Sequence, residues 1–215
     1  MELLDIEFIK TAFLTLFVAI DPPGLATIFI AITTGLTAAE RRATALRASI
    51  IAFCILAASV VGGKAVLEAL GVGIPAFRIA GGLLLFSIAV EMVFEKRQER
   101  KAETAEKAIT QDHLKSIAAF PLAIPLMAGP GAITATIVQA SSANDNWINM
   151  GSLVGIIFII IASCYVVFLL AQPIERLLGV TGKVVLARLL GVLLAAIAVQ
   201  VVGEGLVTFI HEAQL

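Results

Sequence analysis

The chain has 215 residues, of which 60% are hydrophobic and 14% are charged, and its formal net charge is −1. A soluble domain carries about 25% charged residues, so this composition, with a mean hydropathy of +1.02, indicates a membrane protein. The small net charge and the lack of a basic patch argue against a nucleic-acid partner. The acidic first residues lack the basic region of a signal peptide, so we expect no cleaved leader.

Long apolar stretches predict an all-α membrane protein with six transmembrane helices. The expected spans are 8–34, 46–69, 76–94, 116–140, 150–171 and 187–209. Residues 11–39 carry one charge, Asp21, and residues 116–144 carry none. A straight helix over either 29-residue stretch would be about 44 Å long, against a hydrocarbon core of about 30 Å. Both helices are therefore expected to tilt or break.

A proline-glycine pair marks the expected break near the middle of each stretch. Residues 21–27 (Asp-Pro-Pro-Gly-Leu-Ala-Thr) and 128–134 (Ala-Gly-Pro-Gly-Ala-Ile-Thr) place Pro, Gly and Thr at the same relative positions. Such a break frees backbone polar groups, which the bilayer tolerates only where protein or water meets them. Two breaks in matching halves are typical of the substrate site of a secondary transporter.

Other segments of the two halves also match. Gly82–Val93 aligns with Gly191–Val202 at an offset of 109, with seven of twelve positions identical, and Leu-Gly-Val recurs at 70–72 and 178–180. Each half would hold three spans, so the halves must cross the bilayer in opposite directions. The sequence thus predicts two inverted three-helix repeats, 1–95 and 116–215, in one membrane domain.

The segment between the repeats, residues 96–115, mixes charges of both signs and is expected to be a solvated helical linker. Charge is its only evident function, although a regulatory loop stays open as an alternative. Twelve Lys and Arg residues fall in the odd-numbered loops and three on the opposite side. This bias predicts cytoplasmic odd loops and periplasmic termini in a cell inner membrane.

Asp21 lies about 16 Å into its span, counted from Lys10 at helical rise. A carboxylate in mid-bilayer costs several kcal/mol and is expected to face a cavity. Two half-helix N-termini and one carboxylate would suit a zwitterion, or Asp21 would carry H+ or Na+. The expected substrate-binding residues are Asp21, Pro23, Gly24, Leu25, Thr27, Gly129, Pro130, Gly131 and Thr134, and the expected coupling-ion residues are Asp21 and Glu91.

Structural roles for these residues are also open. Asp21 would suit the N-cap of the second half-helix. Thr27 and Thr134 would alternatively donate to carbonyls one turn back in their own helices. Glu91 lies four residues before Glu95 and would alternatively reach the cytoplasmic interface.

Four segments resemble the MarC family of bacterial and archaeal membrane proteins: Asp21–Gly24, Ile28–Thr33, Pro121–Thr134 and Phe77–Gly82. The resemblance covers essentially the whole chain. It implies six spans, kinship with the LysE-type exporter superfamily, and cation-coupled uptake of glycine or alanine as in SnatA-type small neutral amino acid transporters. Many members have Asn directly after the first Pro-Gly and Pro three residues after that Gly, where this chain has Leu25 and Thr27.

Functions other than a small-solute importer stay open. Export of small metabolites is equally compatible, since the sequence does not set direction. Cys54 and Cys164, 110 residues apart, would allow an intramembrane thiol-redox carrier, although single cysteines in apolar helices are usually small hydrophobic residues. His113 and His211 lie near span ends, so no hydrolase or metal cluster, no enzyme activity and no cofactor are expected. Homo-oligomer formation stays open.

Overall fold

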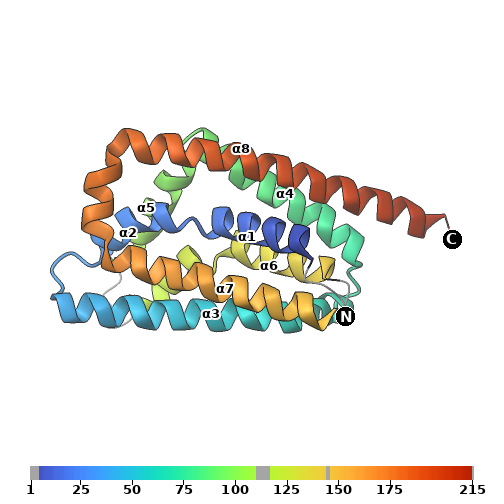
Figure 1. The fold of residues 1–215 in the computed structure, drawn as a ribbon, viewed down its shortest axis with the longest axis horizontal. Helices are drawn as coiled ribbons and strands as arrows, with labels where there is room; N and C mark the ends of the chain where they lie inside the picture. The colour runs from blue at the N-terminus through green and yellow to red at the C-terminus, as the bar shows by residue number, and fades with distance from the viewer. Residues whose placement is uncertain (1–4, 110–116, 144–145, 215) are drawn as a thin grey trace.

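The protein is an all-α bundle, seen in a computed structural model that describes residues 5–109, 117–143 and 146–214. No strand occurs within these ranges. The long helices lie along one axis of an elongated molecule (Figure 1). In chain order the elements are α1 (Ile6–Ile20), α2 (Pro22–Ile32), α3 (Ala38–Ala69), α4 (Ile74–Val93), α5 (Lys96–Ile109), the irregular helical segment η1 (Ala118–Met127), α6 (Pro130–Ser142), α7 (Trp147–Leu169) and α8 (Ala171–Ala213).

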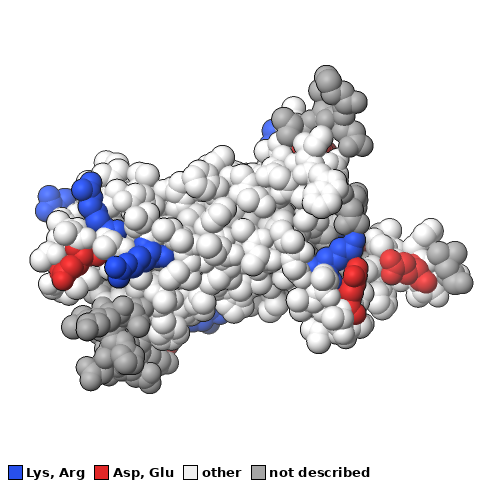
Figure 2. All heavy atoms as spheres, turned by 90° about the horizontal axis from the view of Figure 1, so that it is seen from below, with Lys and Arg blue, Asp and Glu red and all other residues white. Residues whose placement is uncertain are grey.

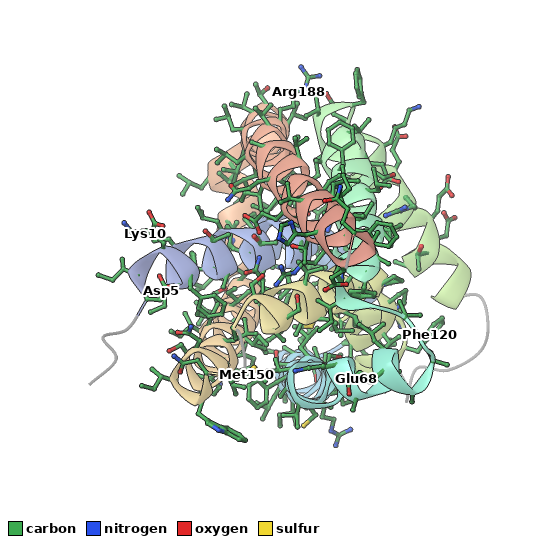
Figure 3. All side chains as sticks on the ribbon, turned by 90° about the vertical axis from the view of Figure 1, so that its right-hand side faces the viewer. Asp5, Lys10, Glu68, Phe120, Met150 and Arg188 are labelled. Atoms are coloured by element: carbon green, nitrogen blue, oxygen red, sulfur yellow. The ribbon has the colours of Figure 1, made fainter. Side chains whose placement is uncertain are left out.

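The outer surface has the polarity of a membrane protein. Charged side chains gather toward the two ends of the face shown in Figure 2, and the band between them is nearly free of charge. Large apolar side chains such as Val61, Phe158 and Val207 are more than half exposed, as lipid contact requires. Figure 3 looks along the bundle from the end that holds Lys10 of α1 and Glu68 of α3.

The described helices give five apolar spans, and a sixth if the bent pair η1 and α6 counts as one. These confirm the six predicted spans, although some ends differ. Helix α3 begins at Ala38, eight residues before the predicted start, because Thr37 and Glu40 form a capping box ahead of the apolar stretch. The sixth span begins at Thr181, after a sharp turn at Gly179, whose φ of 58° and ψ of −172° are readily reached only by glycine.

The first predicted break is confirmed. Helix α1 ends at Ile20, Asp21 takes a left-handed conformation (φ 62°, ψ 64°), and α2 begins at Pro22. Proline lacks an N–H, so two prolines in succession suit the first turn of a new helix and not the interior of a continuous one.

The second predicted break is also confirmed, with an added irregularity upstream. Helix α6 begins at Pro130 and makes an angle of 55° with η1. Within η1, Phe120 and Ile124 are extended because each precedes a proline, which disfavours the helical region for the residue before it. One break was predicted in this span, and the irregular backbone of η1 was not.

The two halves make reciprocal contacts where α4 packs along α8. A Cβ added to Gly82 would lie 3.0 Å from the carbonyl oxygen of Ala198, and one added to Gly191 would lie 3.0 Å from that of Ala89. Both pairs match at the offset of 109, and α4 and α8 run in opposite directions (Figure 1). This reciprocity supports the inverted repeat, which stays a prediction.

The structure differs from the prediction that residues 96–115 form a solvated linker, because one face of the described part of this segment is buried. The segment is helical, as expected, but α5 packs against α2, α4 and η1. Arg97, Lys101 and Ala105 are spaced by four residues, so they share one face of α5, and that face is buried. One face of the predicted linker therefore packs into the bundle, and the two buried cations of that face are close to the first break.

Candidate functional site

Asp21 is the centre of a buried polar cluster at the first break. Its side chain is 4% exposed. The Oδ1 atom accepts a hydrogen bond from the Gly24 N–H at 3.0 Å, which makes Asp21 the N-cap of α2. The Oδ2 atom accepts from Gln98 Nε2 at 3.0 Å and from Lys101 Nζ at 3.2 Å. The N-cap alternative is thus confirmed, and the second carboxylate oxygen is already engaged by α5.

Helix α5 also satisfies the carbonyl groups that the break leaves free. In a continuous helix, the N–H groups of residues 23 and 24 would bond the carbonyls of Ala19 and Ile20. Pro23 has no N–H, and the Gly24 N–H bonds Asp21 instead. Arg97 Nη2 donates to the Ala19 carbonyl and Lys101 Nζ donates to the Ile20 carbonyl at 3.3 Å. The break is therefore completed by two cations from a distant part of the chain.

A cavity of about 360 Å³ adjoins this cluster, and we name it the first-break cavity. Its lining combines residues of the break with residues from α5 and α8, including Asp21, Pro23, Gly24, Thr27, Arg97 and Lys183. The Thr27 hydroxyl accepts a hydrogen bond from Lys183 Nζ at 3.0 Å, and the same ammonium group pairs with Glu175 at 3.3 Å. Thr27 thus has a cationic partner from the other half of the chain.

The second break lines a separate cavity of about 260 Å³, the second-break cavity. Its walls include Gly129, Pro130 and Gly131 of the break and Arg97, Arg100 and Lys101 of α5. Arg97 lines both cavities, so the two breaks are linked through this guanidinium group.

Burial lowers the pKa of both buried cations of α5, and the Asp21 carboxylate opposes this shift in each case. Burial lowers the pKa of Lys101 to about 8, while the Asp21 carboxylate opposes this shift. Burial likewise lowers the pKa of Arg97, again opposed by Asp21. Lys101 is thus mostly protonated at neutral pH but loses its proton at a much lower pH than an exposed lysine.

The predicted site residues divide into three groups. Asp21, Pro23, Gly24 and Thr27 line the first-break cavity, and Gly129, Pro130 and Gly131 line the second-break cavity. The remaining three, which line neither cavity, are Leu25, Thr134 and Glu91.

Leu25 is fully buried in the apolar core, and Thr134 is buried with its methyl group against Gly81 of α4. Neither lines either break cavity. Glu91 pairs with Arg100 at 2.7 Å. Arg97, Gln98, Lys101 and Lys183 were not among the predicted site residues. The four-residue spacing of Arg97 and Lys101 places them on one helix face but does not indicate that this face is buried.

The two thiols do not share an environment. Cys54 on α3 is exposed and Cys164 on α7 is buried, and both are free. Within the described residues no group of three His, Cys, Asp or Glu side chains is arranged to hold a metal ion. His211 lies in the last turn of α8, and His113 lies outside the described residues.

The chain matches the family model described as MarC family integral membrane protein over residues 6–210. It is 43% identical over 206 residues to a UPF0056 membrane protein of Archaeoglobus fulgidus, with 94% of this chain and 93% of the relative covered. It is 37% identical to the UPF0056 membrane protein YhcE of Escherichia coli, with 90% and 89% covered. It is 35% identical to YvbG of Bacillus subtilis, with 93% and 94% covered. No solved structure matches the chain significantly.

Proposed function

We propose that this chain, which belongs to the MarC family of integral membrane proteins, is a secondary transporter of a small zwitterionic solute. The observation that carries the proposal is the pair of interrupted helices, each lining its own cavity, with Arg97 shared between the two. Broken helices facing cavities at matching places in two halves are typical of carriers.

The buried charges support a carrier over a structural membrane protein. Asp21, Arg97 and Lys101 are each less than a tenth exposed. Charged groups inside a membrane protein are costly and usually mark a pathway for solutes, ions or protons. Such charges are often replaced by apolar residues at no cost in stability, so their presence here favours a role beyond packing. We therefore favour a carrier without enzyme activity.

The cavity sizes and charges favour a small substrate with both signs of charge. Volumes of about 360 and 260 Å³ lie at or below the lower end of the roughly 300–1,000 Å³ typical of pockets for drug-sized ligands. The Lys101 ammonium on Asp21 supports the view that this carboxylate accepts a primary ammonium group. Glycine and alanine are our first candidates. For a substrate ammonium to bind Asp21, Lys101 must first release it.

The coupling ion, the direction and the orientation belong to the same proposal. Asp21 is the favoured carrier of H+ or Na+, with Glu91 as the second candidate. The charge bias favours cytoplasmic odd loops and periplasmic termini in a cell inner membrane. Export of another small metabolite is the alternative. The unlike surroundings of Cys54 and Cys164 give no support to a symmetric thiol-redox carrier.

Proteoliposome uptake of labelled glycine and alanine tests the proposal. The parent protein is expected to accumulate one of them under a proton or sodium gradient and to exchange it for unlabelled substrate inside. Asp21→Asn is expected to lose uptake. Arg47→Gln, at an exposed position of α3, and the double variant Cys54→Ala, Cys164→Ala are expected to keep it. Full uptake by Asp21→Asn would remove Asp21 from the mechanism, and uptake of neither amino acid would refute the substrate class.

A further inference from the structure

We propose that the second-break cavity binds the carboxylate group of a small solute between the Arg97 guanidinium and the N-terminus of α6. This inference rests on the proposed function for its role, because it names the chemical group of the transported solute that this cavity binds. Three independent observations carry it: the unused donors of Arg97, the uncapped end of α6, and the charge of the cavity wall.

Arg97 is buried and only partly satisfied. The residue is 5% exposed, and its Nη2 atom donates to the Ala19 carbonyl. Its Nε and Nη1 atoms are buried without a hydrogen-bond partner among the described residues. A buried guanidinium is stable only when charge and hydrogen bonds compensate its desolvation. Arg97 lines the second-break cavity, where a carboxylate would accept from these donors.

The N-terminus of α6 is the second set of free donors. Gly129 is its N-cap and has no side chain to cap the helix, and Pro130 follows at the first position. The N–H groups of the first turn, at Gly131 and Ala132, have no acceptor within the helix. Both residues line the same cavity as Arg97. A helix N-terminus with free N–H groups favours an anion.

The two half-helices differ in a way that points to the ligand. Helix α2 carries its own carboxylate, because Asp21 is its N-cap and bonds the Gly24 N–H. At the N-cap of α6 the residue is Gly129. The α2 terminus is therefore closed to an external carboxylate, while the α6 terminus is open to one. We therefore assign the carboxylate to the α6 terminus alone.

The charge of the cavity wall selects an anion over a cation. Its described lining residues include three cations, Arg97, Arg100 and Lys101, and no Asp or Glu. Arg100 is paired with Glu91 and Lys101 with Asp21, so Arg97 is the cation left to meet an anion. The first-break cavity, by contrast, is lined by Asp21, Glu95 and Glu99 as well as cations. Most other side chains of the second-break cavity are apolar, among them Leu84, Ile88 and Met127. A small carboxylate with an aliphatic body matches this lining.

Equilibrium binding to the purified full-length protein in nanodiscs tests the inference without requiring transport. The probes are acetate, glycine and methylammonium, measured by calorimetry. Acetate and glycine are expected to displace each other, and methylammonium is expected not to displace acetate. Arg97→Gln is expected to weaken acetate binding at least tenfold, and Arg97→Lys, which keeps the charge, by less. Arg47→Gln, which changes an exposed arginine, is expected to bind acetate as the parent does.

The outcomes separate this inference from the proposed function. Unchanged acetate binding by a folded Arg97→Gln or Arg97→Lys variant would overturn the inference, even if glycine were transported. Displacement of acetate by chloride at equal concentration would overturn the assignment to a carboxylate. Arg97-dependent acetate binding in a protein that moves no labelled amino acid would support the site and refute the transporter. Melting temperature and gel-filtration profile without ligand identify variants that fail to fold.

Discussion

Replacing Asp21 with Asn is the most direct test of the cluster at the first break. Asn keeps the size of the side chain, tolerates the left-handed backbone at φ 62°, and is as good an N-cap as Asp. The substitution therefore removes the charge and leaves the backbone and the cap of α2 in place. The Lys101 ammonium loses its carboxylate partner, which lies 3.2 Å away in the parent protein.

The size of the effect follows from the pKa of Lys101. Because that pKa is about 8, the neutral amine lies only about 1–2 kcal/mol above the charged form at pH 7, at roughly 1.36 kcal/mol per pKa unit. In the Asp21→Asn variant, Lys101 avoids leaving an unpaired buried charge by losing its proton. An amide acceptor in place of a carboxylate weakens the remaining hydrogen bonds by about 1 kcal/mol. We expect a total loss of about 2–3 kcal/mol, less than the roughly 3–5 kcal/mol of a buried pair whose remaining charge cannot be neutralised.

The assay is equilibrium unfolding in detergent, measured at several pH values with a double-mutant cycle. The loss in Asp21→Asn is expected to shrink above pH 8, where Lys101 is largely neutral in the parent. The double variant Asp21→Asn, Lys101→Met is expected to recover most of the stability. Trypsin cleavage after Arg97 and Lys101, which are buried on α5, is expected to rise in the single variant. A loss within about 0.5 kcal/mol, the range of neutral surface substitutions, or a loss independent of pH, would refute the buried pair.

Three further predictions concern separate parts of the bundle. The folded-state pKa of Lys101 (about 8) is below the ordinary value of 10.5, so the unfolded chain binds more protons between these pH values. The free energy of unfolding is therefore expected to rise with pH in this range, and Lys101→Met is expected to abolish the rise. Thr27→Val removes the acceptor of Lys183 and is expected to slow uptake in proteoliposomes, and normal uptake would exclude Thr27 from the pathway. Gly191→Ala is expected to lower stability by about 1–3 kcal/mol, because the new Cβ would lie 3.0 Å from a backbone oxygen of α4. Gly203→Ala on the same helix has open space around it and is expected to be neutral or stabilising. Equal effects of the two substitutions would contradict the close packing of α4 on α8.

The sequence was sufficient for the spans and the breaks because both depend on local properties. Twenty or more apolar residues in succession have few alternatives to a transmembrane helix. The Pro22-Pro23 pair cannot continue the hydrogen bonding of α1, and the same steric argument places the start of α6 at Pro130. The N-cap role of Asp21 also follows from its place directly before the prolines.

Only the tertiary structure decided what meets the groups that the breaks set free. Residues 96–109 have the composition of a solvated helix, and no local signal indicates that Arg97 and Lys101 face inward. Their burial becomes favourable only when the carbonyls of Ala19 and Ile20 and the Asp21 carboxylate, about 80 residues earlier in the chain, lie opposite them. A buried cation is stabilised by partners in space, and its neighbours in the sequence do not identify those partners. The sequence therefore determined where the helices break, and the packing of α5 decided which charges line the two cavities.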